Sequence, residues 1–197
     1  MMTKAEKTRQ FIIEKTAPIF NRKGYAGTSL SDITEATGLT KGSIYGNFKN
    51  KDEVAIAAFN YNFGLLSEWI KKKRDNEPDP IKKLKIYISV FSDFTENPVL
   101  RWGCPVLNSA TEVDDTHVDL RDNVVTAIRK WHDSIVKVIN DGKKSGIIKP
   151  DVDATAFGWV LVALIEGGVM LVKVTGKTNT LNAAMDHAKK IIDELAI

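Results

Sequence analysis

Hydrophobic residues recur every three or four positions along most of this chain, and the alternation typical of strands is almost absent. This spacing is that of amphipathic helices, and it predicts an all-α fold. The first helix is expected over residues 3–22, where Pro18 should remove a backbone hydrogen bond and can kink the helix. Gly24 is the expected stop. The apolar face of this helix holds Ile12, Ile13, Ala17 and Phe20.

Two short helices are expected next. Ser29 and Asp32 have the spacing of a capping box and predict the start of a helix that ends near Gly38. Thr40 is the expected N-cap of the following helix. Two short helices around a turn that contains glycine predict a helix-turn-helix. Its small core is expected to consist of Ile33, Ala36, Leu39, Ile44 and Phe48.

The second short helix offers little for burial, because its other positions are small, polar or basic. These positions are Lys41, Gly42, Ser43, Tyr45, Gly46 and Asn47. Such a face suits the DNA major groove, which admits one helix. The charge distribution agrees, since residues 1–51 hold nine bases and four acids while the whole chain has a net charge of only +3. A basic segment points to a polyanionic partner, although a solvated surface would carry the same charges.

The rest of the chain also shows helical spacing. Asn50 with Glu53 predicts the start of a long helix over residues 51–73. Breaks fall at prolines and glycines, among them the segment Gly103-Cys104-Pro105. Further helices are expected over residues 81–95, 120–141 and 154–174, and in a last helix capped by Thr178 or Asn179.

The last two expected helices carry more apolar surface than one small body readily buries. Residues 154–174 are apolar on nearly all sides, and the final helix has an apolar seam. We therefore expect this pair to meet a second copy of the chain and form a four-helix interface. A purely intramolecular core is the alternative. The expected interface residues are Leu161, Leu164, Leu181, Met185, Ala188 and Ile192.

Length and composition narrow the function classes. The chain has 197 residues, enough for a real core, and its single cysteine excludes an internal disulfide and a cysteine-rich zinc site. No secretory signal is visible at the start, so we expect a cytoplasmic protein. Residues 154–174 nearly reach the length of a membrane span, but Glu166 near their middle is costly in lipid and favours a buried helix.

The N-terminal motifs resemble those of TetR-family transcriptional regulators. The resemblance covers roughly residues 4–60, in Thr8-Arg9, Ile12-Ile13, Phe20, Gly24-Tyr25 and the segments 28–33, 36–45 and 48–52. It implies a three-helix DNA-binding domain, residues 1–50, followed by a helical ligand-binding and dimerisation domain, residues 51–197. It also implies a homodimeric repressor that binds a palindromic operator in double-stranded DNA and is released by a small-molecule effector.

The resemblance also implies which residues contact DNA. Hydroxyls, helix N-terminal amides and a lysine would contact phosphate, while residues 41–43 would approach base edges. Asn47 stands where the family often has histidine or tyrosine, and an asparagine can bond adenine in two places. Gly46 removes a side chain that many relatives have. The DNA-contacting residues implied are Thr28, Ser29, Thr40, Lys41, Gly42, Ser43, Tyr45, Asn47 and Lys51.

Aromatic residues of the C-terminal part are candidates to line an effector cavity, which would suit a small apolar or aromatic molecule. The candidate ligand-binding residues are Phe63, Trp69, Phe91, Trp102, Cys104, Trp131, Trp159 and Glu166. Core packing is the alternative for each aromatic residue, and Glu166 could instead bond a partner across the interface. Two other functions stay open: a redox or electrophile sensor that uses Cys104, and a DNA-binding protein without ligand control.

Enzyme chemistry has little support in the sequence. The three histidines are scattered, and the Glu-x-x-His motif of di-iron bundles is missing. An acidic patch contains Glu112, Asp114, Asp115 and His117, and we interpret it as a loop or helix start rather than a metal site. We expect no enzymatic activity, no cofactor and no metal.

Overall fold

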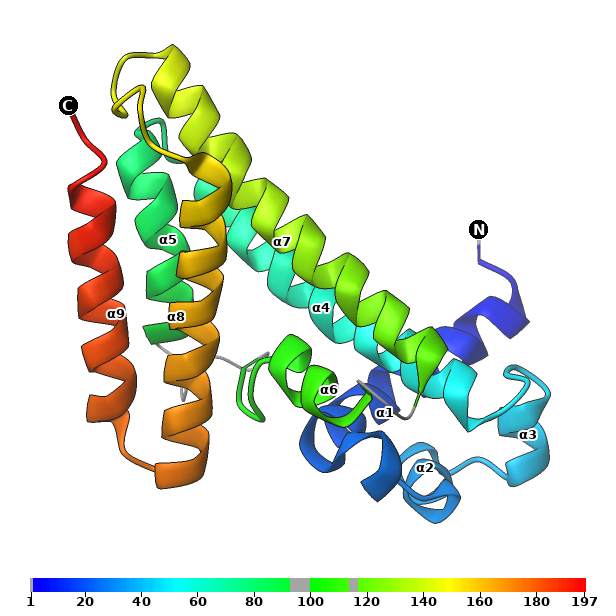
Figure 1. Cartoon of the computed structure of the whole chain (residues 1–197). Helices are drawn as coiled ribbons and strands as arrows, with labels where there is room; N and C mark the ends of the chain where they lie inside the picture. The colour runs from blue at the N-terminus through cyan, green and yellow to red at the C-terminus, as the bar shows by residue number, and fades with distance from the viewer. Residues whose placement is uncertain (1, 93–99, 114–116) are drawn as a thin grey trace. The chain divides into compact units, whose positions relative to one another are not determined.

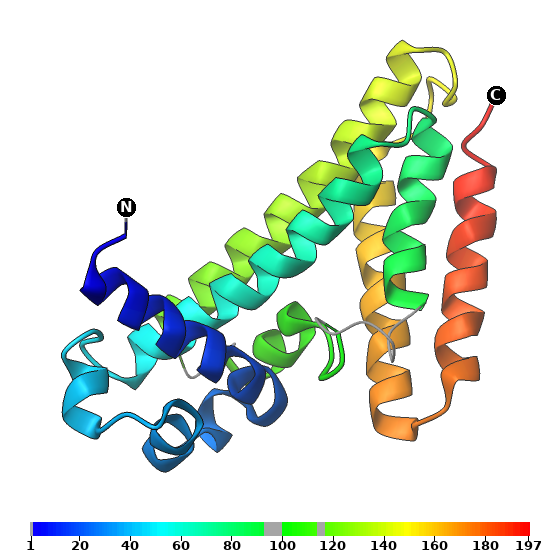
Figure 2. The same ribbon diagram turned by 180° about the vertical axis from the view of Figure 1, so that it is seen from behind.

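A computed structural model describes residues 2–92, 100–113 and 117–197, and these residues form nine helices and no strand (Figures 1 and 2). The predicted all-α fold is therefore confirmed. One isolated antiparallel bridge pairs Ile148 with Ala196. The helices are α1 (Lys4–Gly27), α2 (Leu30–Thr37), α3 (Lys41–Tyr45), α4 (Lys51–Asp75), α5 (Pro80–Ser92), α6 (Pro105–Val113), α7 (Val118–Lys144), α8 (Ala154–Thr175) and α9 (Thr178–Asp193).

The chain divides into two compact units. The first contains residues 1–65 and 102–127, and the second contains residues 66–101 and 128–197. Helices α4 and α7 each contribute their first part to the first unit and the remainder to the second. The first unit thus joins α6 to the three N-terminal helices. The division into a DNA-binding domain, residues 1–50, and a ligand-binding and dimerisation domain, residues 51–197, is a division by function. It stays a prediction.

Local side-chain caps start the helices of the first unit where the sequence predicts them. Ser29 accepts a hydrogen bond from the Asp32 amide, and the Asp32 carboxylate accepts one from the Ser29 amide. Thr40 accepts from the amide of Ser43. These bonds satisfy donors that would have no partner at a helix start, so both predicted start positions are confirmed.

The first helix continues to Gly27 but is interrupted at Gly24, whose φ is +75°. Glycine reaches this left-handed region without steric cost, so the predicted stop is confirmed as a break followed by a final turn. At Pro18 the backbone keeps helical angles, and α1 leaves the helical range at Gly24 alone. The proline therefore removes one hydrogen-bond donor, while the backbone angles around it stay helical.

The core of the first unit lies where α1, α2, α3 and α4 meet. Ile33, Ile44 and Phe48 are at most 2% exposed and belong to it, as predicted, while Leu39 is partly buried against it. The buried members of this core are Ile12, Ala17, Phe20, Ile33, Ile44, Phe48, Val54, Ala55 and Ala58.

Helix α6 was missed in the sequence, where the segment around Cys104 was interpreted only as a break. The helix begins at Pro105, immediately after that break. Proline is well suited to a first helical position, since its missing N–H would have no intrahelical partner there and its φ is already helical. The same residue type therefore signals both the end of one segment and the start of the next.

In the second unit, α8 and α9 lie side by side and α9 also packs on α5 (Figures 1 and 2). Gly168 allows the close approach, because a Cβ there would lie 3.0 Å from a side-chain carbon of Leu181. Helix α9 begins after Lys177, which makes no side-chain cap bond. The prediction that Thr178 or Asn179 caps this helix is therefore wrong by one or two positions.

The predicted interface residues lie mostly inside a single chain, which corrects the prediction. The apolar seam of α9 and one residue of α8 are at most 1% exposed, and Leu164 is partly buried. The seam is covered by α8 and α5 of the same chain, so these side chains are not on its surface. The five residues concerned are Leu161, Leu181, Met185, Ala188 and Ile192.

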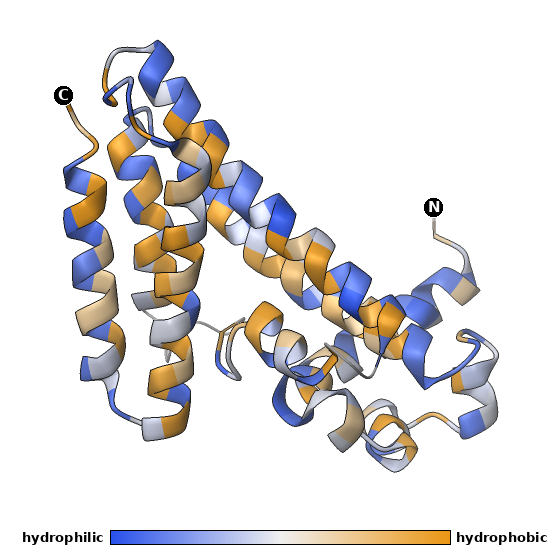
Figure 3. Ribbon diagram, in the orientation of Figure 1, coloured by the Kyte–Doolittle hydropathy of each residue, from blue (hydrophilic) through white to orange (hydrophobic). Residues whose placement is uncertain are grey.

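A different face of α8 is left uncovered. Figure 3 colours most of this helix as hydrophobic or intermediate, although one side faces solvent. Its exposed apolar residues follow helical spacing and form what we call the α8 stripe. The α8 stripe consists of Trp159, Val160, Met170, Leu171 and Val174, which are 43% to 81% exposed.

Candidate nucleic-acid interface

The short helix α3 presents a polar face and is anchored by one buried side chain. Ile44 is 0% exposed, whereas Lys41 and Gly42 are exposed and Ser43 and Tyr45 are partly exposed. The left-handed Gly38, with φ +65°, ends α2 and turns the chain toward Thr40. We call residues 41–48 the recognition segment. Its outer face is open, as required of a helix that enters a groove.

The entrance to α2 differs from the prediction at Thr28. This residue is 0% exposed, its amide donates to the Tyr25 carbonyl, and its hydroxyl donates to the Gly24 carbonyl at 2.6 Å. The expectation that Thr28 presents a hydroxyl to phosphate is therefore wrong, since the side chain holds the end of α1 instead. Ser29 is exposed, but its amide and hydroxyl both donate to Asp32.

Asp32 combines the cap of α2 with an ion pair. Its carboxylate lies 2.6 Å from the ammonium of Lys23 and accepts hydrogen bonds from Ser29. The Lys23 ammonium and these hydrogen bonds lower the pKa of Asp32 to about 2, because they favour the ionised form. The cap is therefore fully formed at neutral pH.

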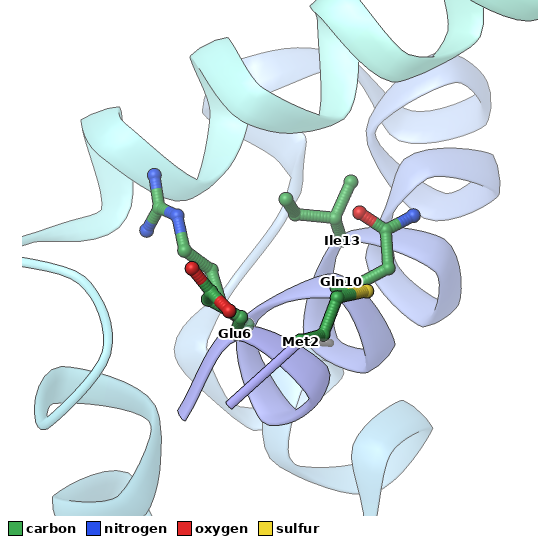
Figure 4. Close-up of a pocket in the computed structure, with 5 residues that line it drawn as sticks. Met2, Glu6, Gln10 and Ile13 are labelled. Carbon is green, nitrogen blue, oxygen red and sulfur yellow. The ribbon is translucent and has the colours of Figure 1, made fainter. Parts of the chain in front are cut away.

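The end of the recognition segment is held by Arg9 of α1. One guanidinium nitrogen donates to the Asn47 carbonyl at 2.8 Å, another lies 2.9 Å from Glu53, and the guanidinium carbon sits 3.9 Å above the Phe48 ring. The Glu53 carboxylate also accepts the amide of Lys49 at 2.8 Å. Arg9 borders a surface pocket of about 550 Å³, lined by Met2, Glu6, Arg9, Gln10 and Ile13 (Figure 4).

The remaining predicted DNA contacts lie around this segment. The ammonium of Lys41 is 6.0 Å from the Tyr45 ring, and that of Lys51 is 4.4 Å from the Tyr25 ring. Burial and the hydrogen bond from Tyr25 to Asp52 raise the pKa of Tyr25 to about 12, so the phenol stays neutral and fixes the start of α4. The Asn47 side-chain amide donates to the Ser43 carbonyl, which engages one of the groups expected to bond adenine.

The candidate effector-binding residues are divided between the two units. Phe63, Trp102 and Cys104 belong to the first unit, where Phe63 stacks on Phe59 and Arg22 lies over Trp102. Cys104 is 0% exposed. A thiol sensor needs solvent access, so this burial argues against the redox alternative.

The other five candidates belong to the second unit. Phe91 and Trp131 are buried and stacked, with ring centroids 5.3 Å apart. Within the described residues, the buried Nε1 of Trp131 has no hydrogen-bond partner. Trp159 is 43% exposed and stacks on His132, so it belongs to the α8 stripe rather than to an enclosed wall. Trp69 lies beneath Lys73, and Glu166 is partly buried.

The acidic patch proposed as a loop or helix start is only partly visible. Glu112 is in α6, and His117 precedes α7, while Asp114 and Asp115 lie outside the described residues. Among the residues that the structure describes, no group of three or more His, Cys, Asp or Glu side chains is placed to hold a metal ion.

Sequence reasoning missed two kinds of residue at this site. Arg9 enters the sequence prediction only through the motif Thr8-Arg9, and Glu112 and Asn108 of α6 contact α1 across 87 positions of the chain. A motif can flag Arg9, but no local signal reports a partner so far away. These contacts depend on how α6 packs against α1.

Comparison with known families and structures agrees with this geometry. The family model described as bacterial regulatory proteins, tetR family, matches residues 12–58. A second model, described as tetracyclin repressor-like, C-terminal domain, matches residues 80–188, which is more than half of the chain.

Individual relatives match over nearly the whole chain. The crystal structure of a TetR-family transcriptional regulator from Cytophaga hutchinsonii is 39% identical, covers 100% of this chain and 98% of its own, and has a TM-score of 0.93. The uncharacterized regulator YxaF of Bacillus subtilis is 27% identical over 91% of both chains. The transcriptional repressor DhaR of Mycobacterium sp. is 25% identical, over 84% of this chain and 82% of its own.

The Asp32 cap yields a prediction about acid. Because the pKa of Asp32 is lower in the folded chain than its usual 3.8, its contribution to stability is present above about pH 4 and is lost as the pH falls toward 2. Asp32→Ala should therefore lower the free energy of unfolding in urea at pH 7, and the difference from wild type should narrow between about pH 4 and pH 2. Ser31→Ala, an exposed neighbour, is the control. A difference that stays constant over this range would contradict the assignment.

Proposed function

Because this chain belongs to the TetR family of transcriptional regulators, we propose that it is a repressor that binds a palindromic operator as a homodimer and is released by a small-molecule effector. The recognition segment is the observation that carries the proposal. A five-residue helix that contributes a single side chain, Ile44, to the core and keeps an open basic and polar face offers little reason for its presence in packing alone. The repressor assignment draws support from DhaR, which is named a repressor. Cytoplasmic localisation fits a DNA partner, and regulators of this family are generally not enzymes.

In this proposal the exposed start of α3 contacts base edges. Thr40, Lys41 and Ser43 have side chains at or near the surface, and Gly42 lets the backbone approach closely. Ser29, Tyr45 and Lys51 supply phosphate contacts. The side-chain oxygen of Asn47 accepts no hydrogen bond among the described residues and is an acceptor for a base donor. Thr28 is no longer included, because it is buried.

The phosphate contact of Lys51 can be tested by salt dependence. Lys51→Ala should weaken binding to duplexes of unrelated sequence similarly and reduce the slope of log K against log salt by about one, because one lysine–phosphate contact is lost. Gel-shift titrations at several salt concentrations measure both effects. Lys72→Ala is the matched control, since Lys72 is exposed on the same helix and lies roughly 30 Å further along its axis. An unchanged slope for Lys51→Ala would refute the contact.

The homodimer is proposed to form through the α8 stripe. The stripe runs along α8 at helical spacing, and its neighbour Gly167 is open, with nothing near the place of a Cβ. Contiguous exposed apolar surface of this kind marks a protein–protein contact, and identical helices commonly pair about a two-fold axis. Among the helices that the structure describes, α8 is the one long and apolar enough to cross a membrane by length and composition. However, its opposite side packs on α9, and regulators of this family are soluble.

A charge placed on the stripe should separate the subunits. Leu171→Asp would bury an unpaired carboxylate in the contact, so light scattering should show a monomer where the wild type is a dimer. Val118→Asp is the control, because Val118 is 68% exposed in the first unit and lies outside the stripe. If Leu171→Asp stays dimeric with native circular dichroism, the contact surface lies elsewhere.

Effector control is supported by the Phe91–Trp131 stack. A buried indole N–H without an acceptor is uncommon in proteins, and within the described residues Trp131 is such a case. An effector with an aromatic or apolar body and a hydrogen-bond acceptor would satisfy it. Cys104 is buried, so we favour effector binding over thiol chemistry.

Thermal stabilisation separates an effector-controlled regulator from a DNA-binding protein without ligand control. Aromatic compounds are compared in matched pairs, with and without a carbonyl or hydroxyl acceptor. A member with the acceptor should raise the melting temperature of the wild type. Trp131→Phe should keep the stack but bind that compound about fivefold more weakly, as expected for one hydrogen bond of about 1 kcal/mol. If no compound raises the melting temperature, ligand control loses its support, and equal stabilisation of Trp131→Phe would exclude the hydrogen bond.

A further inference from the structure

Glu112 of α6 bonds the backbone of α1 directly after its break. One carboxylate oxygen accepts the amide hydrogen of Tyr25 and the other that of Ala26, both at 2.6 Å. Both amides belong to the last turn of α1, which follows Gly24. A helix that restarts after a break leaves its first amides without intrahelical acceptors, and a carboxylate with two oxygens satisfies two of them with charge-assisted bonds.

The break at Gly24 and the carboxylate fit each other closely. A Cβ at position 24 would lie 2.4 Å from one oxygen of Glu112 and 2.9 Å from its carboxyl carbon. The residue also has φ +75°, which side chains rarely adopt. Glycine thus serves two purposes here, since it permits the backbone turn and leaves space for Glu112.

A second polar contact fixes α6 against α1. The side-chain nitrogen of Asn108 lies 2.9 Å from the Asn21 carbonyl, the Asn21 side-chain oxygen and the Trp102 carbonyl. The buried Asn21 in turn donates to the Gly103 carbonyl at 3.1 Å. Four positions separate Asn108 from Glu112, so both side chains project from the same side of α6. The carboxylate is therefore held by a helix whose own position is set.

The bonded turn leads directly into the DNA-contacting helices. The Thr28 hydroxyl donates to the Gly24 carbonyl, and the Thr28 amide donates to the Tyr25 carbonyl. The next residue, Ser29, caps α2. The hydroxyl of Tyr25 donates to Asp52 in the first turn of α4. The position of residues 24–26 thus sets both where α2 begins and how α1 meets α4. Helix α2 in turn packs on α3.

We propose that Glu112 is a positioning residue for DNA binding, which sets the direction of α2 and α3 by holding the backbone of residues 25 and 26. This inference rests on the proposed function. It predicts a change in DNA affinity opposite to the one that electrostatic repulsion alone would give. An acidic side chain in a DNA-binding unit repels phosphate, so its removal should strengthen binding if charge alone mattered. If Glu112 positions the backbone, its removal weakens binding.

The test compares Glu112→Ala, Glu112→Gln and wild type on a duplex that the wild type selects from a random pool. Glu35→Ala is the matched control, because it removes one exposed acidic side chain from α2 and leaves the bonds from Glu112 to α1 in place. We expect Glu112→Ala to bind about tenfold more weakly, the factor that corresponds to about 1.4 kcal/mol. The salt slope should not change, since no phosphate contact is lost. Glu112→Gln, which is equally uncharged, keeps one acceptor oxygen but presents an NH2 donor to the second amide, so it should recover only part of the affinity.

Amide hydrogen exchange keeps the test independent of gross unfolding. It is measured where circular dichroism shows each variant to be fully helical, and Glu112→Ala should speed exchange at Tyr25 and Ala26 while that of Ile33 and Ile44 stays slow. Binding of Glu112→Ala equal to or tighter than wild type would overturn the inference and leave the proposed function intact. Loss of slow exchange throughout α2 and α3 would also overturn it, because Glu112 would then be needed for folding. A wild type that binds no duplex would overturn the proposed function and this inference together.

Discussion

The recognition segment depends on the burial of Ile44 and Phe48, because a helix of five residues cannot hold itself together. Nucleating a helical turn is unfavourable, and isolated helices of this length do not persist in water. The two side chains are at most 2% exposed and fix the segment against α1, α2 and α4. Arg9 adds a hydrogen bond and a ring contact at its far end. The polar outer face thus takes no part in this packing and is available to a partner.

The same division between a buried anchor and an open face recurs in α8. One side of this helix covers the seam of α9, and the α8 stripe on the other side has no cover within the described residues. Periodicity in a sequence tells which face of a helix is apolar, but it does not tell whether the cover comes from the same chain or from a second copy. For this reason the spacing predicts a surplus of apolar surface on α8, but five of the six residues expected at the interface are buried inside the chain.

Features controlled by neighbours in sequence could be predicted, and those controlled by packing could not. The caps at Ser29 and Thr40, the stop at Gly24 and the open face of α3 all follow from spacing within a few residues. Thr28 has the residue type of a phosphate contact, yet its position after the break in α1 turns its hydroxyl inward. Glu112 meets Tyr25 only because α6 packs on α1, and α6 itself was missed.

The central claim is that a dimer holds two recognition segments, each of which contacts nucleotides. Selection of duplexes from a random pool, by gel shift at low ionic strength, tests it most directly. The account predicts enrichment of an inverted repeat whose half-sites lie about one helical turn apart, roughly 34–36 Å, bound by two copies of the chain. Failure to retain any duplex, or retention without enrichment of a repeated half-site, would contradict it.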